Sequence, residues 1–276
     1  MRLEFTKMHG LGNDFIVFDA PAGTALPSRE QFRKLSDRHT GVGFDQALVI
    51  EPPRRAGTVA FYRIFNADGG EVEQCGNGAR CVAALLRQTD RTKSNSLVMD
   101  SPAGTIQARF EDRSLVSVDM GTPNFAPASL PFVGGPEAMQ YTLDVAGKSL
   151  RFGAVSIGNP HAVITVPSVA DAAVASMGSL LDAHPAFPKG VNVGFMQIVD
   201  ADALRLRVYE RGVGETLACG TGACAAVAVG RQRGKLAERV RVQLPGGELT
   251  VSWAGPGHSI WLTGPAETAF RGHVEI

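Results

Sequence analysis

Apolar and polar residues alternate over many short stretches of this chain, which is the period expected of β-strands with one buried face. In the first half, the alternation and the β-branched and aromatic residues predict strands at 2–7, 14–18, 46–51, 59–65, 96–100, 105–110 and 114–118. In the second half, the same features predict strands at 150–157, 161–166, 193–199, 203–209, 239–244, 248–253 and 258–262. We expect the tail after Gly264 to return to the first half.

Helical patterns occur twice in each half. Ser28 to Arg38 predicts an amphipathic helix with Ser28 as N-cap, and Val169 to Leu181 predicts a weaker counterpart. Ala79 to Leu86 and Ala223 to Val229 are small and apolar on nearly all sides, which is typical of a buried helix. The pattern therefore predicts an α+β fold of two pseudo-symmetric halves, each a mostly antiparallel sheet rolled around a central helix.

Four sequence anchors occur in the same order in the two halves, which indicates an internal duplication. Gly10 to Phe15 matches Ser156 to His161, Gly41-Val-Gly-Phe matches Gly190-Val-Asn-Val, a Cys-Gly-x-Gly-Ala motif occurs at Cys75 and at Cys219, and Leu97 to Gly104 matches Val240 to Gly247. We place the junction near 119–124, where Gly and Pro occur. The expected lobes are 1–119 plus 265–276, carrying Cys75, and 120–264, carrying Cys219.

Composition narrows the function classes. The 276 residues include 27 basic and 27 acidic ones, so the chain has no broad basic field for nucleic acid or a membrane surface. No apolar run approaches the roughly 20 residues that span a bilayer, and the first residues lack the apolar core of a signal peptide. We expect a cytoplasmic protein with a small-molecule substrate.

The four cysteines do not form a disulfide scaffold in a chain of this length. Cys75 and Cys81 have five residues between them, Cys219 and Cys224 have four, and neither spacing makes a zinc knuckle. We therefore expect no metal. A redox disulfide between the halves stays open, because an exposed thiol of low pKa is easily oxidised.

Cys75 and Cys219 each begin a predicted helix, where the helix dipole stabilises a thiolate and the first amide groups can bind a carboxylate. Flanking glycines let a ligand approach the backbone. Two facing thiols could remove a proton from one side of a carbon and return one from the other, which needs no cofactor. The alternative is that both are buried apolar side chains, which we favour only for Cys81 and Cys224.

Several polar residues have both a functional and a structural interpretation. Glu210 and Arg211 suit an ammonium and a carboxylate, although an ion pair at the surface is the ordinary interpretation. Four asparagines lie beside glycine or in turn-like settings, and their recurrence at the repeat anchors favours ligand contacts over turn chemistry: Asn13, Asn66, Asn159 and Asn192. His161 follows Pro160 at a strand start, and the residues alone leave its role undecided.

The chain resembles the diaminopimelate epimerase family nearly from end to end. The resemblance rests on Met8-His-Gly-Leu-Gly-Asn-Asp-Phe, Phe65-Asn-Ala-Asp-Gly, Gln74-Cys-Gly-Asn-Gly-Ala-Arg-Cys, Gly158-Asn-Pro-His-Ala-Val and Glu210-Arg-Gly-Val-Gly-Glu-Thr-Leu-Ala-Cys-Gly-Thr-Gly-Ala-Cys. It implies an isomerase that interconverts LL- and meso-2,6-diaminopimelate without pyridoxal phosphate, in lysine and peptidoglycan precursor synthesis. It also implies a homodimer.

The resemblance assigns roles to matching residues. Cys75 and Cys219 would be the two acid/base thiols, with Cys219 accepting the proton and Cys75 donating one for LL to meso. Backbone amides at Gly76-Asn77 and Gly220-Thr221 would hold the reacting carboxylate. Substrate would also meet Asn13, Gln46, Asn66, Asn159, Asn192, Glu210 and Arg211, with His161 and Glu210 assisting catalysis. The chain has Asp68-Gly-Gly-Glu71 where relatives often have Asp-Gly-Ser-Glu, and Phe270 where some have a tyrosine at the dimer interface.

Three other functions stay open at this stage. A racemase of the proline racemase type would use the same thiol chemistry without a distal Glu-Arg clamp. A thiol redox or metal-binding protein, or a binding module without catalysis, would need neither proton transfer nor inversion.

Overall fold

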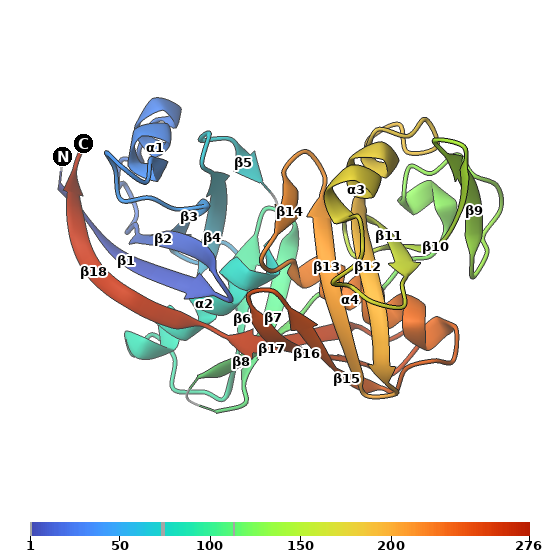
Figure 1. Cartoon of the computed structure of the whole chain (residues 1–276). Helices are drawn as coiled ribbons and strands as arrows, with labels where there is room; N and C mark the ends of the chain where they lie inside the picture. Colours follow the sequence, from blue (N-terminus) through green and yellow to red (C-terminus); the bar gives the residue numbers. More distant parts are fainter. Residues whose placement is uncertain (1, 73–74, 113) are drawn as a thin grey trace. The chain divides into compact units, whose positions relative to one another are not determined.

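The computed structural model describes residues 2–72, 75–112 and 114–276 (Figure 1). Glu73 and Gln74, which open the first cysteine motif, lie outside the described residues. The chain divides into two compact units, which are described separately. Unit 1 is Met1–Asp119 with Thr263–Ile276, and unit 2 is Met120–Leu262.

Unit 1 is mainly strands. They are β1 (Arg2–Gly10), β2 (Asn13–Asp19), β3 (Gln46–Glu51), β4 (Phe61–Asn66), β5 (Glu71–Val72), β6 (Ser96–Ser101), β7 (Gly104–Phe110), β8 (Leu115–Asp119) and β18 (Glu267–Glu275). The helices are α1 (Arg29–Ser36) and α2 (Gly76–Gln88). Strand β18 pairs antiparallel with β1, so the C-terminal segment lies along the N-terminal strand in Figure 1.

Unit 2 has the same kinds of element. Its strands are β9 (Tyr141–Val145), β10 (Lys148–Ser156), β11 (Pro160–Thr165), β12 (Asn192–Asp200), β13 (Ala203–Glu210), β14 (Gly214–Thr216), β15 (Arg239–Leu244), β16 (Gly247–Trp253) and β17 (Ile260–Pro265), the last of which contains the unit boundary. Its helices are the short η1 (Pro127–Ser129), α3 (Val174–Asp182) and α4 (Gly220–Gln232).

Strand pairing repeats from one unit to the other. In unit 1, β1–β2 is antiparallel, β2–β3 parallel, β3–β4 and β4–β5 antiparallel, β4–β6 parallel and β6–β7 antiparallel. In unit 2, β10–β11, β11–β12, β12–β13, β13–β14, β13–β15 and β15–β16 pair with the same directions in the same order. The predicted duplication and the α+β class are confirmed.

Register corrects one of the sequence anchors. Phe15 pairs with Gln46 across β2–β3, and His161 pairs with Asn192 across β11–β12. Since Asn13 and Asn159 begin the matched segments, Gln46 is the counterpart of Asn192. Matching Gly41 to Gly190 was therefore wrong by three residues, because both loops contain a Gly-Val pair but at different distances from the strand that follows.

Helices α2 and α4 occupy the central position predicted for them. Helix α2 contacts β1, β2, β3, β7 and β8, and α4 contacts β10, β11, β12, β13 and β16. Each sheet thus wraps around one helix, which explains why the helix residues are buried on nearly all sides. Ala79 to Leu86 was predicted to be apolar on nearly all sides, and the charged residue in it, Arg80, is also fully buried.

Helices α1 and α3 cover the other face of their sheets. Ser28 caps α1 as predicted, in a capping box with Gln31, and Phe32 stacks on Phe65 with ring centroids 4.7 Å apart. Helix α3 begins at Val174, not at Val169 as predicted. The backbone at 169–172 forms a turn because Gln197 and Arg207 hydrogen-bond to it, which overrides its helical propensity.

The described residues include no helix that is long and apolar enough to cross a membrane. Strands β5, β9, β14 and β18 were not predicted, although the tail that forms β18 was expected to return to the first half. Strands β5 and β14 have only two and three residues, too few to show a period.

Candidate active site

Cys75 is the N-cap of α2. Its backbone is extended (φ −148°, ψ 111°), and its sulfur accepts the Gly78 amide at 3.4 Å. The Ala79 amide bonds to the Cys75 carbonyl at 2.9 Å. The sulfur therefore sits where serine or aspartate usually caps a helix, in the field of the first turn.

Cys219 is placed in the same way at α4. Its backbone is extended (φ −119°, ψ 108°), and its sulfur accepts the Gly222 amide at 3.3 Å. The Ala223 amide bonds to the Cys219 carbonyl at 3.0 Å. Each unit therefore presents one N-cap sulfur at the start of its central helix.

The third helical position leaves little room for a side chain in both motifs. A Cβ at Gly78 would lie 3.0 Å from the Leu48 side chain, and one at Gly222 would lie 3.0 Å from Val208 and 3.2 Å from the Cys219 sulfur. Glycine thus lets the sulfur reach the third amide. The first amides of a helix have no acceptor within the helix, so those at Gly76-Asn77 and Gly220-Thr221 suit an anion such as a carboxylate.

Amide side chains surround Cys75 in unit 1. The Asn77 side-chain nitrogen donates to the Asn13 oxygen at 3.1 Å, and that oxygen lies 3.9 Å from the Cys75 sulfur. Nearby, Gln46 donates to Asn66 at 2.9 Å across β3–β4. Four of the residues predicted to contact substrate thus form two hydrogen-bonded pairs, Asn13 with Asn77 and Gln46 with Asn66. Both pairs lie on the face of the sheet opposite α1.

An ionic cluster holds Asn13 in place. The Asn13 side-chain nitrogen donates to Asp45 at 3.1 Å, and Arg38 bonds to both Asp45 and Asp14. Burial raises the pKa of the Asp14 carboxyl. The hydrogen bonds from Arg38 and Lys7 together have a larger, opposite effect, and they lower this pKa to about 2. With its nitrogen used by Asp45, Asn13 turns its oxygen toward Asn77.

Tyr62 lies fully buried on β4, on the same face as Asn66. Burial, and then the charge of Cys75, raise the pKa of its hydroxyl, so it stays neutral.

The cluster around Cys219 in unit 2 uses a hydroxyl in place of one amide. The Asn159 side-chain nitrogen donates to the Thr221 hydroxyl at 3.3 Å, and that oxygen lies 3.6 Å from the Cys219 sulfur. The His161 Nε2 lies 2.9 Å from the Asn159 oxygen. Because the Asn159 oxygen can only accept, the histidine Nε2 carries the hydrogen.

His161 is fully buried, and burial together with the positive charge of Arg211 lowers its pKa to about 3. The imidazole is therefore neutral at physiological pH. It can donate a hydrogen bond and orient Asn159, but it cannot act there as a charged acid.

Charged groups lie at the end of β13 in unit 2. Glu210 accepts the Thr216 hydroxyl at 2.6 Å, and the Asn192 side-chain oxygen accepts the Arg211 amide at 3.0 Å. The Arg211 guanidinium donates to the Lys189 carbonyl at 3.1 Å, and the residue is exposed. An ammonium and a carboxylate of a ligand could both be paired here.

The other two cysteines and Phe270 lie apart from these clusters. Cys81 and Cys224 are fully buried within α2 and α4, as predicted, and burial raises the pKa of the Cys81 thiol to about 12. Phe270 is half exposed on β18 and packs edge-on against Phe5.

Sequence reasoning missed Lys7, Asp14, Arg38 and Asp45 in the ionic cluster around Asn13, Arg80, which donates to the Asn77 oxygen, and Thr216, which donates to Glu210. Arg80 is part of the printed cysteine motif, and a charged residue inside an otherwise apolar helix was a usable signal. Asp45 and Thr216 had no such signal, because each looks like an ordinary polar residue next to a strand.

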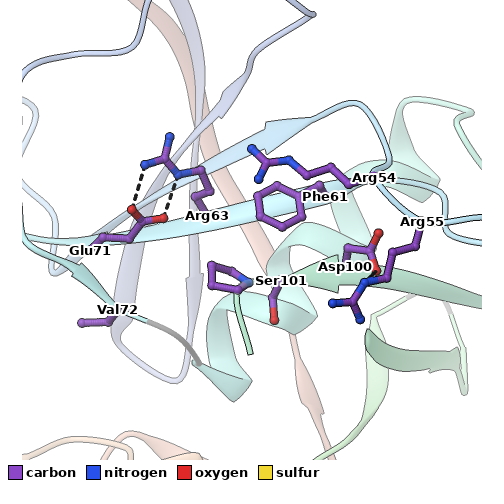
Figure 2. A pocket seen from close by; sticks show the side chains of 9 residues that line it. Arg54, Arg55, Phe61, Arg63, Glu71, Val72, Asp100 and Ser101 are labelled. Atoms are coloured by element: carbon purple, nitrogen blue, oxygen red, sulfur yellow. Dashed lines mark hydrogen bonds and ion pairs between the residues drawn. The ribbon is translucent and has the colours of Figure 1, made fainter. Parts of the chain in front are cut away.

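Unit 1 also has a hollow of about 790 Å³ that contains none of the predicted site residues. Figure 2 shows Arg63 bonded to both oxygens of Glu71 and Arg55 directed at Asp100. Arg54 pairs with Glu51. Each of these arginines therefore has a carboxylate partner, and we assign the hollow no ligand.

Solved structures share this duplicated α+β fold. A hydroxyproline epimerase from Agrobacterium vitis, with bound trans-4-hydroxy-L-proline, superposes with a TM-score of 0.72 at 18% identity, over 99% of this chain and 92% of that chain. A phenazine biosynthesis protein from Bacillus anthracis gives a TM-score of 0.70 at 16% identity, over 100% of both chains. At these identities the likeness shows the fold alone.

Sequence comparison is more specific. The sequence model of diaminopimelate epimerase matches residues 5–126 and 153–269. A diaminopimelate epimerase from Nitrosomonas europaea is 51% identical over 276 residues, which is 100% of both chains. The chain belongs to the diaminopimelate epimerase family.

Proposed function

We propose that this protein is an isomerase that interconverts LL- and meso-2,6-diaminopimelate by acid/base catalysis with two thiols and without a cofactor. The observation that carries the proposal is the matched pair of N-cap cysteines, one at the central helix of each unit. In a chain of this family, the product would serve lysine and peptidoglycan precursor synthesis.

The chemistry assigned to the thiols is a proton removed and a proton returned. For LL to meso, the Cys219 thiolate takes the α-proton, and the Cys75 thiol gives its proton to the opposite face of the same carbon. Cys219 ends as a thiol and Cys75 as a thiolate, so the charge balances and the reverse reaction starts from that state. The amides at Gly76-Asn77 and Gly220-Thr221 stabilise the negative charge that develops on the reacting carboxylate.

The remaining polar residues recognise substrate. Glu210 and Arg211 bind the distal ammonium and carboxylate, since they are the charged pair among the predicted contact residues. The amides around them complete the hydrogen bonding: Asn13, Gln46, Asn66, Asn159 and Asn192. His161 assists as a neutral donor that orients Asn159, which is consistent with its burial and low pKa.

The wider assignment follows the family. We propose that the two units are the catalytic lobes, that the protein is cytoplasmic, and that it forms a homodimer. Strand β18 supports the dimer, because its residues are largely exposed and Phe270 presents an aromatic ring there.

Heavy-water exchange tests the proposal. LL-diaminopimelate is incubated with the protein in deuterium oxide without added cofactor, and products are analysed by NMR and chiral chromatography. We expect one deuterium at one α-carbon as the meso isomer forms. Cys75→Ala and Cys219→Ala should each abolish inversion, because each removes one of the two proton carriers.

The buried cysteines provide the matched controls. Cys81→Ala and Cys224→Ala change a cysteine in the same helices and should leave inversion near the wild-type rate. Full activity of either N-cap variant would refute the two-thiol mechanism. Faster inversion of proline would favour the proline racemase type, and binding of diaminopimelate with no hydrogen exchange would favour a binding module.

A further inference from the structure

Arg80 is a fully buried arginine in the second turn of α2. Placing a guanidinium inside a protein costs several kcal/mol unless its donors are paired. Its neighbours in the helix are small or apolar, so the packing of α2 does not require a charge at this position. A specific role for the guanidinium would explain why it is there.

Three segments that are distant in sequence surround this guanidinium. Its Nη2 donates to the Asn77 side-chain oxygen at 2.9 Å, and its Nε lies 3.4 Å from the Pro265 carbonyl oxygen. A Cβ at Gly10 would lie 3.1 Å from Nη2, so glycine at the end of β1 leaves room for it. The guanidinium is thus fixed by contacts from α2, β17 and β1.

The contact with Arg80 decides which way the Asn77 amide faces. An amide has an oxygen that only accepts and a nitrogen that only donates. Since Arg80 occupies the oxygen, the nitrogen is directed to the Asn13 oxygen, at 3.1 Å. Asn13 is fixed at its other end by Asp45, and its oxygen lies beside the Cys75 sulfur. One chain of hydrogen bonds therefore joins Arg80 to the surroundings of the thiol.

Unit 2 has no arginine at the position equivalent to Arg80. The position five residues after Cys219 is Cys224, the counterpart of Arg80, and Thr221 takes the place of Asn77. Thr221 still accepts from Asn159, at 3.3 Å. A hydroxyl rotates and serves as donor or acceptor, so it needs no partner to set its direction. The arginine accompanies the half-site that has an amide.

We propose that Arg80 is a positioning residue for the Cys75 half-site: it sets the orientation of the Asn77 amide and, through it, of Asn13 beside the thiol. The role rests on the proposed function, because it acts on one of the two thiols of that mechanism. Arg80 itself does not need to touch substrate.

Arg80→Met, Arg80→Lys and the control Cys224→Ala test this role. We expect Arg80→Met to lower kcat roughly tenfold to hundredfold, because a charged hydrogen bond is lost and the amide is released, with a smaller change in KM. Alkylation of Cys75 by iodoacetamide, followed by peptide mass spectrometry without substrate, should speed up roughly threefold to tenfold in Arg80→Lys, which keeps the positive charge, because the Asn13 oxygen that accepts from the Cys75 thiol is released. Alkylation of Cys219 in the same sample should not change, and Cys224→Ala should behave as wild type.

A double variant separates positioning from folding. Asn77→Thr copies the residue of unit 2, which needs no guanidinium, so adding Arg80→Met to it should cost much less activity than adding Arg80→Met to the wild type. Arg80→Lys keeps the charge but loses the fork, and it should stay impaired in kcat. These comparisons are made on samples with native circular dichroism.

The proposal is overturned if Arg80→Met lowers kcat by the same factor in the wild type and in Asn77→Thr. It is also overturned if the rate of Cys75 alkylation does not change. Unfolding of both Arg80 variants that Asn77→Thr does not reverse would also overturn it, since Arg80 would then be a folding residue. If wild-type protein does not invert diaminopimelate, the proposed function fails, but the alkylation contrast between Cys75 and Cys219 still measures the role of Arg80.

Discussion

Cys75 in unit 1 has amide side chains beside it, whereas the equivalent Cys219 in unit 2 lies in a cluster with a hydroxyl, an imidazole and a charged pair nearby. The backbone is the same in the two cases: an extended N-cap cysteine, a sulfur that accepts the third amide, and a helix wrapped by its sheet. The comparison shows that duplication preserved the part that positions a thiol and that the side chains around it diverged.

The divergence occurs at positions that the strand register aligns. Gln46 and Asn192 are counterparts, and continuing the register of β12–β13 makes Asn66 the counterpart of Glu210. The aligned pairs, unit 1 first, are Phe15 and His161, Gln46 and Asn192, Asn66 and Glu210, Ala67 and Arg211, Asn77 and Thr221, and Arg80 and Cys224. At these positions unit 2 has the charged or titratable residues His161, Glu210 and Arg211, where unit 1 has Phe15, Asn66 and Ala67.

Replacing Arg211 should have the largest effect on this comparison. Arg211→Ala gives unit 2 the small residue that unit 1 has at Ala67, and it removes the proposed partner of the distal carboxylate. A charged hydrogen bond contributes about 1.5–3 kcal/mol, so kcat/KM for diaminopimelate should fall roughly tenfold to 150-fold. The measurement is the initial rate of inversion across substrate concentrations.

The control is a substrate that lacks the distal carboxylate. With L-lysine, which keeps the distal ammonium but has no distal carboxylate, the α-hydrogen exchange rates of wild type and Arg211→Ala should differ much less. A variant that keeps wild-type kcat/KM for diaminopimelate would show that unit 2 is not the half-site that reads the distal head.

The second prediction concerns His161, whose counterpart Phe15 cannot titrate. Its pKa is lowered from 6.5 to about 3 in the folded protein, so the folded state keeps it neutral while the unfolded chain takes up a proton. The free energy of unfolding is therefore unaffected by the titration of this histidine above pH 6.5, and it decreases as the pH falls from 6.5 toward 3. At about 1.4 kcal/mol per pH unit, the loss between pH 6.5 and 5 is about 2 kcal/mol.

His161→Phe should remove that part of the pH dependence. We expect its thermal midpoint to fall less than that of the wild type between pH 6.5 and 5, even if the variant is less stable at pH 8 through the lost bond to Asn159. Replacing an exposed histidine, for example His273→Asn, should leave the slope unchanged. Parallel slopes for His161→Phe and wild type would mean that the buried imidazole does not resist protonation.

The long strands and the cysteine motifs were the repeated parts that the sequence could predict. The Cys-Gly-x-Gly-Ala motif marks both N-caps, and the strand periods locate β3 and β15 at their observed bounds, because long alternation and a glycine-rich helix start are local signals. The repeat anchors indicated Asn13 and Asn159, and the family resemblance added Asn77 and Thr221. All four lie in the hydrogen-bonded clusters around the thiols.

The parts that failed depend on contacts between distant segments. The start of α3 is set by Gln197 and Arg207, which bond to a backbone that would otherwise favour a helix. The orientation of Asn13 is set by Asp45, and that of Asn77 by Arg80. No local pattern reports such contacts, because each partner is compatible by itself with an ordinary surface or core position.

The smallest expected effect tests a feature that the units share. Arg63 makes a bidentate ion pair with Glu71 across β4–β5, with an Nε–Oε1 distance of 2.7 Å. Arg207 makes the same kind of pair with Glu215 across β13–β14, with an Nε–Oε1 distance of 2.6 Å. The hydrogen bond from Arg63 holds the pKa of the Glu71 carboxyl below its usual value. The ion pair therefore stabilises the folded state at neutral pH, and this contribution is lost as the pH falls through the lowered pKa. Partly exposed pairs contribute about 0.2–1 kcal/mol. Glu71→Gln and Glu215→Gln should therefore speed hydrogen exchange in their own hairpin only, and by similar factors, measured by mass spectrometry at neutral pH. Glu71 also lines the hollow of Figure 2, whereas Glu215 does not. A much larger loss of exchange protection in Glu71→Gln than in Glu215→Gln would therefore show that the hollow has a role beyond the shared hairpin. Similar losses of protection would show that the two ion pairs are a structural element that duplication kept.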